Sequence, residues 1–310
     1  MKIIINKIIK NWKTVFSISA FVAVTSIFSC SQDPEYTIPT NPPIEIDPLV
    51  IPINELYKDL DFTAIAGHRC YSRKSPENSL AAIQDALDLG IEILEADIQT
   101  TADDIPILLH DTTVDRTTNG TGIVANMNFG NLSNFRLKNN RNGAVITDEN
   151  IPTLEQALLK IKGKKIYMHL EVKDKKFSQV IRVIKSTKSE NQVILFADRR
   201  EDYKIIDTFV GIYMNPVCRT AADFNFYISK SKVVMLNLAG SQFNGDNTLA
   251  AKNNNKLTWR GISGDSEDLE LISGATLTPD LDELIQINPS IINTDFADLM
   301  IPYLKSKNKR

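Results

Sequence analysis

The chain has 310 residues, of which 43% are hydrophobic and 24% are charged, and its formal net charge is −3 at pH 7. This composition is ordinary for a globular protein and leaves enough apolar residues for a sizeable core. Because nucleic acids are bound through an excess of basic residues, the acidic balance argues against nucleic acid as a partner.

Residues 1–29 have the layout of a secretory signal peptide. Lysines precede an uncharged apolar stretch from Val15 to Phe28, which is short for a membrane span. The stretch ends in Ser26–Cys30, which resembles the cleavage region of a bacterial lipoprotein, with Cys30 as the acylated residue. The alternatives are an ordinary secretory signal or an uncleaved anchor, in which Cys30 is an incidental thiol.

Residues 30–55 are predicted to form a proline-rich tether. A chain processed at Cys30 loses four lysines and no acidic residue, so 31 basic residues against 38 acidic ones leave a formal charge of −7. The remaining Cys70 and Cys218 are too few for a disulfide framework or a zinc site. The protein is therefore expected in the cell envelope, held at a membrane by its N-terminal lipid and facing the periplasm or the cell exterior. No feature of the sequence indicates an oligomeric state.

Residues 56–310 alternate short apolar runs with helical patterns, as expected for parallel βα units. Eight strands are predicted, at residues 62–67, 91–97, 165–172, 191–197, 208–214, 231–238, 256–262 and 290–295. Eight strands in a chain of this length favour an α/β fold of the (β/α)₈ TIM barrel type over a doubly wound sheet.

The first two predicted helices carry start and stop signals. In the first helix, Ser75 is expected to cap Pro76 at the first helical position, and Gly90 ends the helix. The second helix begins after Pro152. Its apolar side consists of Leu154, Ala157, Leu158 and Ile161.

One segment departs from the βα alternation. Ile105–His110 follows the second strand after a turn at Thr101–Asp104, which is too short for a parallel crossover. The segment must return antiparallel, so a β-hairpin insertion is expected above the barrel mouth after strand 2. The two arms are equal in length, which brings His110 back level with Glu95.

Acidic residues gather at the ends of two predicted strands. Because side chains alternate along a strand, Glu95 and Asp97 face the same way, and so do His169, Glu171 and Lys173. The three carboxylates suit one hard divalent cation, Mg²⁺ or Ca²⁺, better than zinc. Any one of them alone is more simply interpreted as a salt bridge or a solvated strand end. His169 lies one layer deeper and is interpreted as a hydrogen-bonded interior residue.

The first strand ends at His68, which is followed by Arg69. An imidazole titrates near neutral pH, so His68 is a candidate general acid or base, although a lone histidine there is more often structural. The guanidinium of Arg69 offers a fork that binds phosphate oxygens, with a surface salt bridge as its alternative role. Beside the carboxylates, these two residues indicate phosphoester chemistry.

Further short motifs accompany these residues along the chain. They are Pro76-Glu77-Asn78-Ser79, Glu95-Ala96-Asp97, His110-Asp111, the run from Asp115 to Gly122, Leu170-Glu171-Val172-Lys173, Trp259 and Thr294-Asp295. With His68-Arg69, this combination resembles the glycerophosphodiester phosphodiesterase family. The resemblance spans residues 62–302 and is strongest over residues 66–122.

The resemblance implies a metal-dependent TIM-barrel enzyme that hydrolyses glycerophosphodiesters to glycerol 3-phosphate and an alcohol. By the same resemblance, the catalytic acid and base are His68 and His110, the phosphate is held by Arg69 and Lys173, and one divalent cation, Ca²⁺ or Mg²⁺, is bound by Glu95, Asp97 and Glu171. The glycerol 2-hydroxyl is the implied nucleophile, and water then opens the resulting cyclic phosphate. The sequence does not determine which histidine is the acid and which is the base.

Two other functions remain open from the sequence. One is a related phospholipase-like enzyme that acts on lipid or inositol phosphodiesters. The other is a non-catalytic lipoprotein that captures glycerophosphodiesters. A complete set of metal ligands and histidines argues against the binder, because capture needs no general acid or base.

Two positions depart from the family pattern. Cys70 stands where glycine normally follows His-Arg, and its side chain is expected to narrow the mouth or to alter a backbone dihedral. Asp103-Asp104 stands where the hairpin usually turns on Asp-Gly. The hairpin is expected to survive, because aspartate tolerates the left-handed conformation better than most residues.

Overall fold

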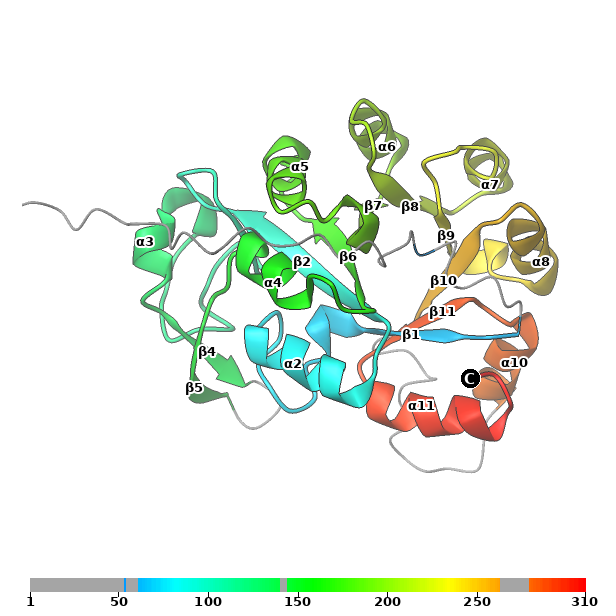
Figure 1. Cartoon of the computed structure of the whole chain (residues 1–310), viewed down its shortest axis with the longest axis horizontal. Helices are drawn as coiled ribbons and strands as arrows, with labels where there is room; N and C mark the ends of the chain where they lie inside the picture. Colours follow the sequence, from blue (N-terminus) through cyan, green and yellow to red (C-terminus); the bar gives the residue numbers. More distant parts are fainter. Residues whose placement is uncertain (1–52, 54–60, 140–143, 263–278) are drawn as a thin grey trace, which may run out of the picture. The chain divides into compact units, whose positions relative to one another are not determined.

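Eight parallel strands close into a barrel in this computed structural model, which describes residue 53 and residues 61–139, 144–262 and 279–310 (Figure 1). In ring order the strands are β1 (Ala64–Gly67), β2 (Ile93–Thr100), β6 (Tyr167–Val172), β7 (Val193–Ala197), β8 (Tyr213–Cys218), β9 (Met235–Leu238), β10 (Leu257–Gly261) and β11 (Ile291–Thr294). The ring is closed because β1 pairs with both β2 and β11. The predicted TIM barrel is therefore confirmed.

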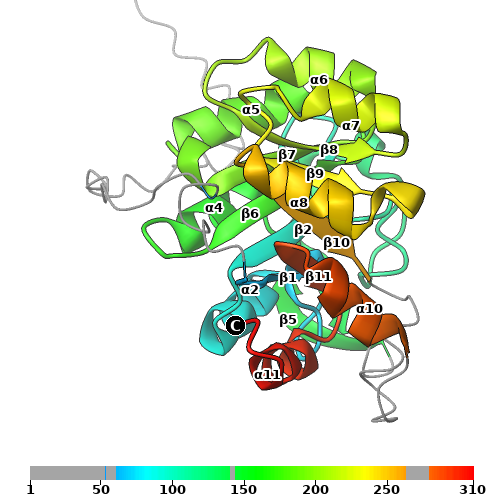
Figure 2. The same cartoon turned by 90° about the vertical axis from the view of Figure 1, so that its right-hand side faces the viewer.

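Helices cover the outside of the barrel (Figures 1 and 2). They are α2 (Leu80–Leu89), α4 (Leu154–Ile161), α5 (Phe177–Ser186), α6 (Arg200–Asp207), α7 (Ala221–Tyr227), α8 (Gly245–Asn253), α10 (Pro279–Ile287) and α11 (Ala297–Ser306). None of the helices in the described ranges has the length and apolar character needed to cross a membrane.

Side-chain alternation divides the apolar residues of most barrel strands between two cores. In β2, Leu94 and Ala96 belong to the core between the strands and the helices, whereas Ile93 belongs to the core inside the barrel. Glu95 and Asp97 share the inward face with Ile93, because residues two apart on a strand point the same way. The alternation thus directs two carboxylates into the barrel, above its apolar interior.

The interior core includes a residue from upstream of β1. Ile53 is 1% exposed and belongs to the same cluster as Ile93, Tyr167 and Ile291, which are the first residues of β2, β6 and β11. Ile53 therefore closes the N-terminal end of the barrel. It is the one described residue of the predicted tether 30–55; the rest of the tether, the predicted signal peptide and Cys30 lie outside the described residues.

Ile53→Ala is expected to lower the free energy of unfolding by about 2–5 kcal/mol, because it removes buried methyl groups and leaves a cavity. Chemical denaturation followed by circular dichroism measures the change. Val210→Ala is the matched control, since Val210 is 80% exposed and its truncation is expected to cost less than about 0.5 kcal/mol. Equal effects of the two substitutions would show that Ile53 does not support the barrel.

The predicted hairpin after strand 2 is present. β3 (Pro106–Leu108) pairs antiparallel with the end of β2, with Leu108 opposite Ile98. At the turn, Asp104 adopts the left-handed conformation with φ 59°, which aspartate tolerates at modest cost. The ladder continues past β3, because the Leu109 N–H donates to the Asp97 carbonyl at 2.9 Å. His110 therefore lies beside the acidic end of β2.

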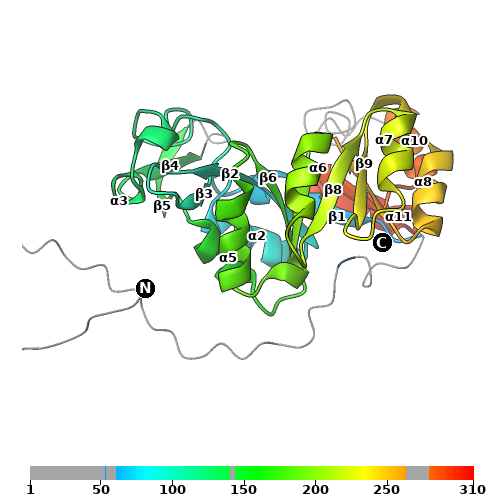
Figure 3. The same ribbon diagram turned by 90° about the horizontal axis from the view of Figure 1, so that it is seen from above.

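A second small sheet follows the hairpin and was not predicted. Between β3 and α4 the chain forms η2 (Val124–Asn126), α3 (Phe129–Leu132), β4 (Arg136–Asn139) and β5 (Val145–Asn150), which lie together at one end of β2 and β3 (Figure 3). This insertion has its own core, which contains Leu132 and Ile151. Alternation in β3 joins the two bodies, because Ile107 packs into the insertion core and Leu108 into the main core.

The first helix begins later than predicted. Its N-cap is Ser79, whose hydroxyl accepts from the Ala82 N–H at 3.0 Å, and not Ser75. The preceding Asn78 has φ 56°, a left-handed conformation that interrupts any helix started at Pro76. The predicted end at Gly90 is confirmed, with φ 76° at the C-cap.

The second predicted helix is confirmed as α4. Thr153 forms a capping box with Gln156, and all four predicted apolar residues of the helix are buried.

The fifth barrel strand lies further along the chain than the predicted residues 208–214. Thr208 caps the end of α6, and Gly211 has φ 75°, so the chain is still turning where the strand was expected. The strand β8 runs from Tyr213 to Cys218 and includes Pro216. Because proline is rare inside strands, Pro216 makes this strand hard to predict from the sequence.

Candidate active site

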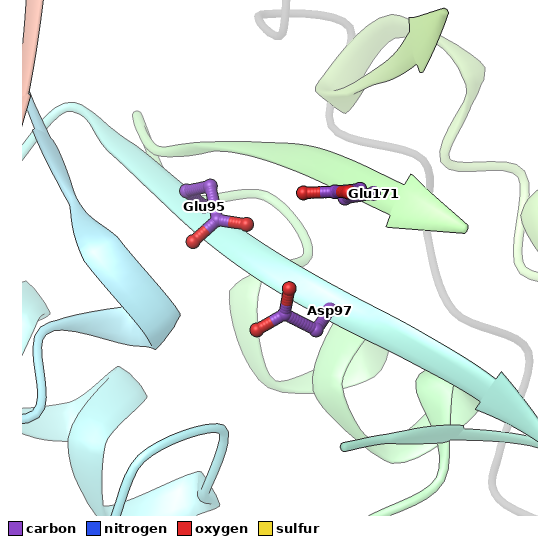
Figure 4. Close-up of side chains that lie close together, drawn as sticks. All are labelled: Glu95, Asp97 and Glu171. Atoms are coloured by element: carbon purple, nitrogen blue, oxygen red, sulfur yellow. The ribbon is translucent and has the colours of Figure 1, made fainter. Parts of the chain in front are cut away.

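Three carboxylates meet where β2 and β6 run side by side. Glu95 and Asp97 project from β2 and Glu171 from β6 (Figure 4), and one oxygen of each lies within 4.8 Å of the others. The parallel register produces this arrangement, because Asp97 and Glu171 are paired across the two strands. Lys173 joins them, with Nζ at 3.0 Å from an oxygen of Asp97 and 3.0 Å from one of Glu171. The predicted acidic cluster is thus assembled.

The electrostatics of the cluster favour a bound cation. Glu95 and Asp97 are only 5% and 1% exposed. Burial and then the neighbouring Asp97 raise the pKa of Glu95 to about 8. Burial would also raise the pKa of Asp97, but the Lys173 ammonium, His110 and the hydrogen bonds from Asn78 and Lys173 together outweigh it, and the pKa is lowered. An oxygen-only donor set with this excess of negative charge fits one hard divalent cation, Mg²⁺ or Ca²⁺.

Asn78 fixes the orientation of Asp97, a role that sequence reasoning did not assign. Its Nδ2 donates to Asp97 Oδ2 at 2.9 Å, and its Oδ1 accepts from the Asp97 N–H at 3.2 Å. The left-handed backbone of Asn78 allows both contacts at once. Its position inside the Pro76–Ser79 motif was the available signal.

His68 is held between two carboxylates. Its Nδ1 lies 2.9 Å from Asp295 Oδ1, and its Nε2 lies 3.9 Å from Glu95 Oε2. Burial lowers the pKa of His68, but the hydrogen bond to Asp295 and the charge of Glu95 outweigh it, so the pKa is raised. Asp295 had appeared only in the Thr294-Asp295 motif, 227 residues away, without an assigned role.

Arg69 is fixed through its backbone and its side chain. The Arg69 N–H donates to Glu95 Oε2 at 2.8 Å, and the guanidinium donates to Glu77 Oε1 at 3.0 Å. Its Nε lies 3.8 Å from Asp97 Oδ2 and is buried without a hydrogen-bond partner among the described residues. The predicted phosphate-binding arginine therefore faces the acidic cluster, and its Nε donor has no hydrogen-bond partner among the described residues.

His110 is backed by a carboxylate of its own. Its Nδ1 lies 2.7 Å from Asp111 Oδ1, and Gln99 Nε2 donates to its backbone carbonyl at 3.1 Å. Asp111 also accepts from Nε of Arg116 at 2.7 Å. Sequence reasoning singled out His110 but gave no role to Asp111 or Arg116, although both lie in quoted motifs.

A cavity of about 230 Å³ opens beside His68 and Arg69. All of its lining side chains are polar or charged, and they belong to His68, Arg69, Ser72, Ser75, Glu77, Asn139 and Asp295. The cavity therefore suits a small hydrophilic group.

Cys70 does not narrow the mouth, contrary to one of the two expectations. Arg69, Cys70 and Tyr71 are all left-handed, with φ of 50°, 63° and 69°. This turn, in η1 (His68–Cys70), places Cys70 in the main core with no exposed surface. Cys70 adopts the left-handed conformation that a glycine takes readily, and the other expectation, an altered backbone dihedral, stays a prediction.

His169 is an interior residue, as interpreted from the sequence. It is 3% exposed, stacks on Trp259 with ring centroids 4.3 Å apart, and lies 3.1 Å from Asn215 Nδ2 through Nε2. Burial lowers the pKa of His169 to about 3, so the ring is neutral at physiological pH.

The arrangement defines the class of protein as a TIM barrel with a functional site at the C-terminal mouth of the barrel. Histidines, acidic residues and cationic groups converge at the C-terminal ends of β1, β2, β6 and β11, the face at which TIM barrels carry their functional groups. Two solved structures share this fold. A glycerophosphoryl diester phosphodiesterase from Parabacteroides distasonis matches 82% of this chain and 90% of its own length, with a TM-score of 0.70 and 23% identity. An Oleispira antarctica phosphodiesterase solved with the product sn-glycerol-3-phosphate matches 79% of this chain and 97% of its own, with a TM-score of 0.62 and 17% identity.

Sequence comparison places the chain more narrowly. The model of the glycerophosphoryl diester phosphodiesterase family matches residues 68–233, more than half of the chain, and the chain belongs to this family. Human glycerophosphodiester phosphodiesterase 1 is 38% identical over 125 residues, which cover 38% of this chain and 36% of the human protein. The glycerophosphodiester phosphodiesterase of Caldanaerobacter subterraneus is 32% identical over 139 residues, which cover 43% of this chain and 57% of that protein. The match thus spans a third to just over half of these relatives.

Proposed function

We propose that this protein hydrolyses glycerophosphodiesters to glycerol 3-phosphate and an alcohol. One observation carries the proposal: two carboxylate-backed histidines, His68 and His110, are positioned beside one acidic cluster and two cationic side chains. That set provides two proton-transfer groups and the charges that a phosphodiester requires. The product in the Oleispira antarctica structure, sn-glycerol-3-phosphate, is the product that this reaction would release.

Glu95, Asp97 and Glu171 would hold one divalent cation, Mg²⁺ or Ca²⁺. When bound there, such a cation supplies a Lewis acid that offsets negative charge on phosphate oxygens and lowers the pKa of a coordinated hydroxyl. Arg69 and Lys173 would hold the phosphate, since Arg69 lines the polar cavity and Lys173 lies within the acidic cluster.

The two histidines would move the protons. In each ring, Nδ1 lies against a carboxylate, Asp295 for His68 and Asp111 for His110, so the opposite nitrogen Nε2 is the one available for exchange. One ring would take the proton of the attacking hydroxyl, and the other would give a proton to the departing alcohol, roles commonly worth about 10²–10⁴-fold each.

The cavity supports a small hydrophilic substrate over a phospholipid. Its volume of about 230 Å³ and its polar lining, which includes Ser72, Ser75 and Asn139, do not match an acyl chain. This observation favours glycerophosphodiesters over the phospholipase-like alternative.

Turnover of a substrate panel tests the proposal. Glycerophosphocholine, glycerophosphoethanolamine and glycerophosphoinositol are incubated with the purified protein, with Mg²⁺, with Ca²⁺ and with excess chelator, beside a phospholipid in vesicles. We expect release of glycerol 3-phosphate from at least one diester, dependent on the cation, and no cleavage of the phospholipid. Cleavage of the phospholipid alone would reject the proposal, and binding of the diesters without turnover would favour the non-catalytic alternative.

We also infer that the protein works in the cell envelope, anchored through a lipid on Cys30. The support is the apolar stretch Val15–Phe28 that ends at this cysteine, followed by a proline-rich segment. In cells fed labelled palmitate, the full chain is expected to incorporate label and to sediment with membranes, whereas Cys30→Ser should do neither. Label in Cys30→Ser would refute the anchor.

A further inference from the structure

We propose that Arg116 is a positioning residue that holds Asp111 so that Asp111 fixes the ring of His110. The proposal rests on the hydrolytic function proposed above, because it assigns how one of the two proton-transfer groups is oriented. Among the described residues, Arg116 donates hydrogen bonds to Asp111 and Glu77 and to no residue of the acidic cluster.

The contact between Arg116 and Asp111 is a two-point one. Arg116 Nε donates to Asp111 Oδ2 at 2.7 Å, and Nη2 donates to Oδ1 at 3.0 Å. A planar guanidinium matches a carboxylate in this fork geometry and fixes its plane, which a single contact cannot do. The hydrogen bonds from Arg116 hold the pKa of Asp111 well below its usual range. Because an aspartate is already ionised at neutral pH, what the fork adds is a fixed orientation of the carboxylate.

An ionised Asp111 determines the state of the neighbouring ring. Asp111 Oδ1 lies 2.7 Å from His110 Nδ1, and an ionised carboxylate can only accept hydrogen bonds. Nδ1 of His110 must therefore carry a proton, which leaves the lone pair of the neutral ring on Nε2. Arg116 thus holds in place the carboxylate that selects this tautomer of His110.

The other edge of the Arg116 guanidinium binds Glu77, which in turn binds Arg69. Nη1 and Nη2 donate to the two oxygens of Glu77 at 2.8 and 2.9 Å, and Glu77 also accepts from Arg69 at 3.0 Å. A continuous chain of ion pairs runs from Arg69 through Glu77, Arg116 and Asp111 to His110. Exposed single ion pairs contribute little, but a two-sided bidentate network is the exception.

The geometry favours positioning over substrate binding. The guanidinium has five N–H donors, and the four hydrogen bonds to Asp111 and Glu77 leave only one of them. Arg116 therefore has a single N–H donor left for a phosphate, fewer than Arg69 has.

Steady-state kinetics with a double-mutant cycle test whether Arg116 acts on His110 through Asp111. Arg116→Gln is expected to lower kcat by about 10–100-fold and to change KM much less, as for other groups that orient a reacting side chain. Asp111→Asn should give a similar loss, and adding Arg116→Gln to Asp111→Asn should cause no further loss, because the arginine acts through the aspartate. Additive losses would overturn the proposal.

Two further variants separate positioning from charge and from folding. Arg200→Gln is the matched control, because Arg200 is 41% exposed against 40% for Arg116 and also pairs with an aspartate, Asp223 at 3.1 Å. It should keep wild-type kcat. Arg116→Lys keeps the charge but loses the fork and should recover only part of kcat; full activity of Arg116→Lys would overturn the positioning role.

A spectroscopic readout works without turnover. The chain has three histidines, so ¹⁵N-labelled histidine gives three assignable rings, whose nitrogen shifts report which nitrogen carries the proton. With Mg²⁺ present, the wild type and Arg200→Gln should show the Nδ1–H form of His110, and Arg116→Gln should lose it. Retention of that form in Arg116→Gln would overturn the proposal. A wild type with this signature but no diesterase activity would reject the proposed function alone.

Discussion

Glu95→Gln is expected to lower the turnover of glycerophosphodiesters by about 10³-fold or more and to abolish binding of the divalent cation. The substitution replaces one of three carboxylates with a neutral amide, a much weaker cation ligand, and losing a Lewis acid costs several kcal/mol of transition-state stabilisation, at 1.36 kcal/mol for each tenfold. Asp97→Asn should behave in the same way, because it occupies the same cluster and is 1% exposed.

Thermal unfolding with and without added cation checks this result. The wild type should gain several degrees in Tm with millimolar Mg²⁺ or Ca²⁺, because a ligand that binds only the folded state stabilises it. Glu95→Gln should lose that gain while its Tm without cation stays at the wild-type value or rises, since burial beside Asp97 already disfavours the charged form of Glu95 and the amide carries no charge. Wild-type turnover of Glu95→Gln in excess chelator would overturn the metal assignment.

Glu92→Gln is the matched control for a carboxylate near the start of the same strand. Glu92 accepts from the Ile65 N–H at 2.9 Å and pairs with Arg310 at 2.6 Å, away from the acidic cluster. It is expected to lower the Tm and to keep cation binding.

His110→Ala and His68→Ala are each expected to lower kcat by about 10²–10⁴-fold, because each removes a proposed proton-transfer group. The measurement is the initial rate on the best diester of the panel at saturating cation. His169→Asn serves as the control, since His169 is buried in the interior and stacks on Trp259. It should lower stability while kcat of the folded protein changes by only a few-fold.

Both alanine variants retaining the wild-type rate would require the acid–base roles to be abandoned. A loss in His68→Ala alone would leave one proton-transfer group and would point to water or substrate as the other. Leaving-group dependence then separates the two roles. The variant that lacks the acid should lose most activity on diesters with poor leaving alcohols, because those need the donated proton most.

The acidic cluster was predictable because a local rule and the barrel order act together. Residues two apart on a strand face the same way, so Glu95 and Asp97 share a face, and the barrel pairs β2 with β6, which brings Glu171 beside them. The hairpin followed from a similarly local constraint, the short turn before Ile105.

The first residue of α2 could not be predicted from the neighbouring sequence, because contacts with a distant residue determine where the helix begins. Pro76 and Ser75 form a plausible helix start, but Asn78 is held left-handed beside Asp97, 19 residues away, by two hydrogen bonds. The position of Cys70 followed from three successive left-handed residues, a run that a sequence containing no glycine there does not suggest.

The carboxylates behind the histidines required the folded chain as well. Asp295 reaches His68 across 227 residues, because closure of the barrel brings β11 beside β1. Arg116 was part of a quoted motif, yet its contacts to Glu77 and Asp111 exist only once the insertion meets the loop before α2.

The separate core of the insertion has a consequence for how this site can evolve. His68 belongs to the barrel, whereas His110 continues from the hairpin whose Ile107 and Leu109 are packed in the insertion core. The two proposed proton-transfer groups thus stand on separately packed modules, which are joined through β3 and through the ion pairs from Arg69 to His110. Substitutions in the insertion core can change the position of His110 and, through Asn139, the shape of the polar cavity, while the barrel that carries the acidic cluster keeps its packing.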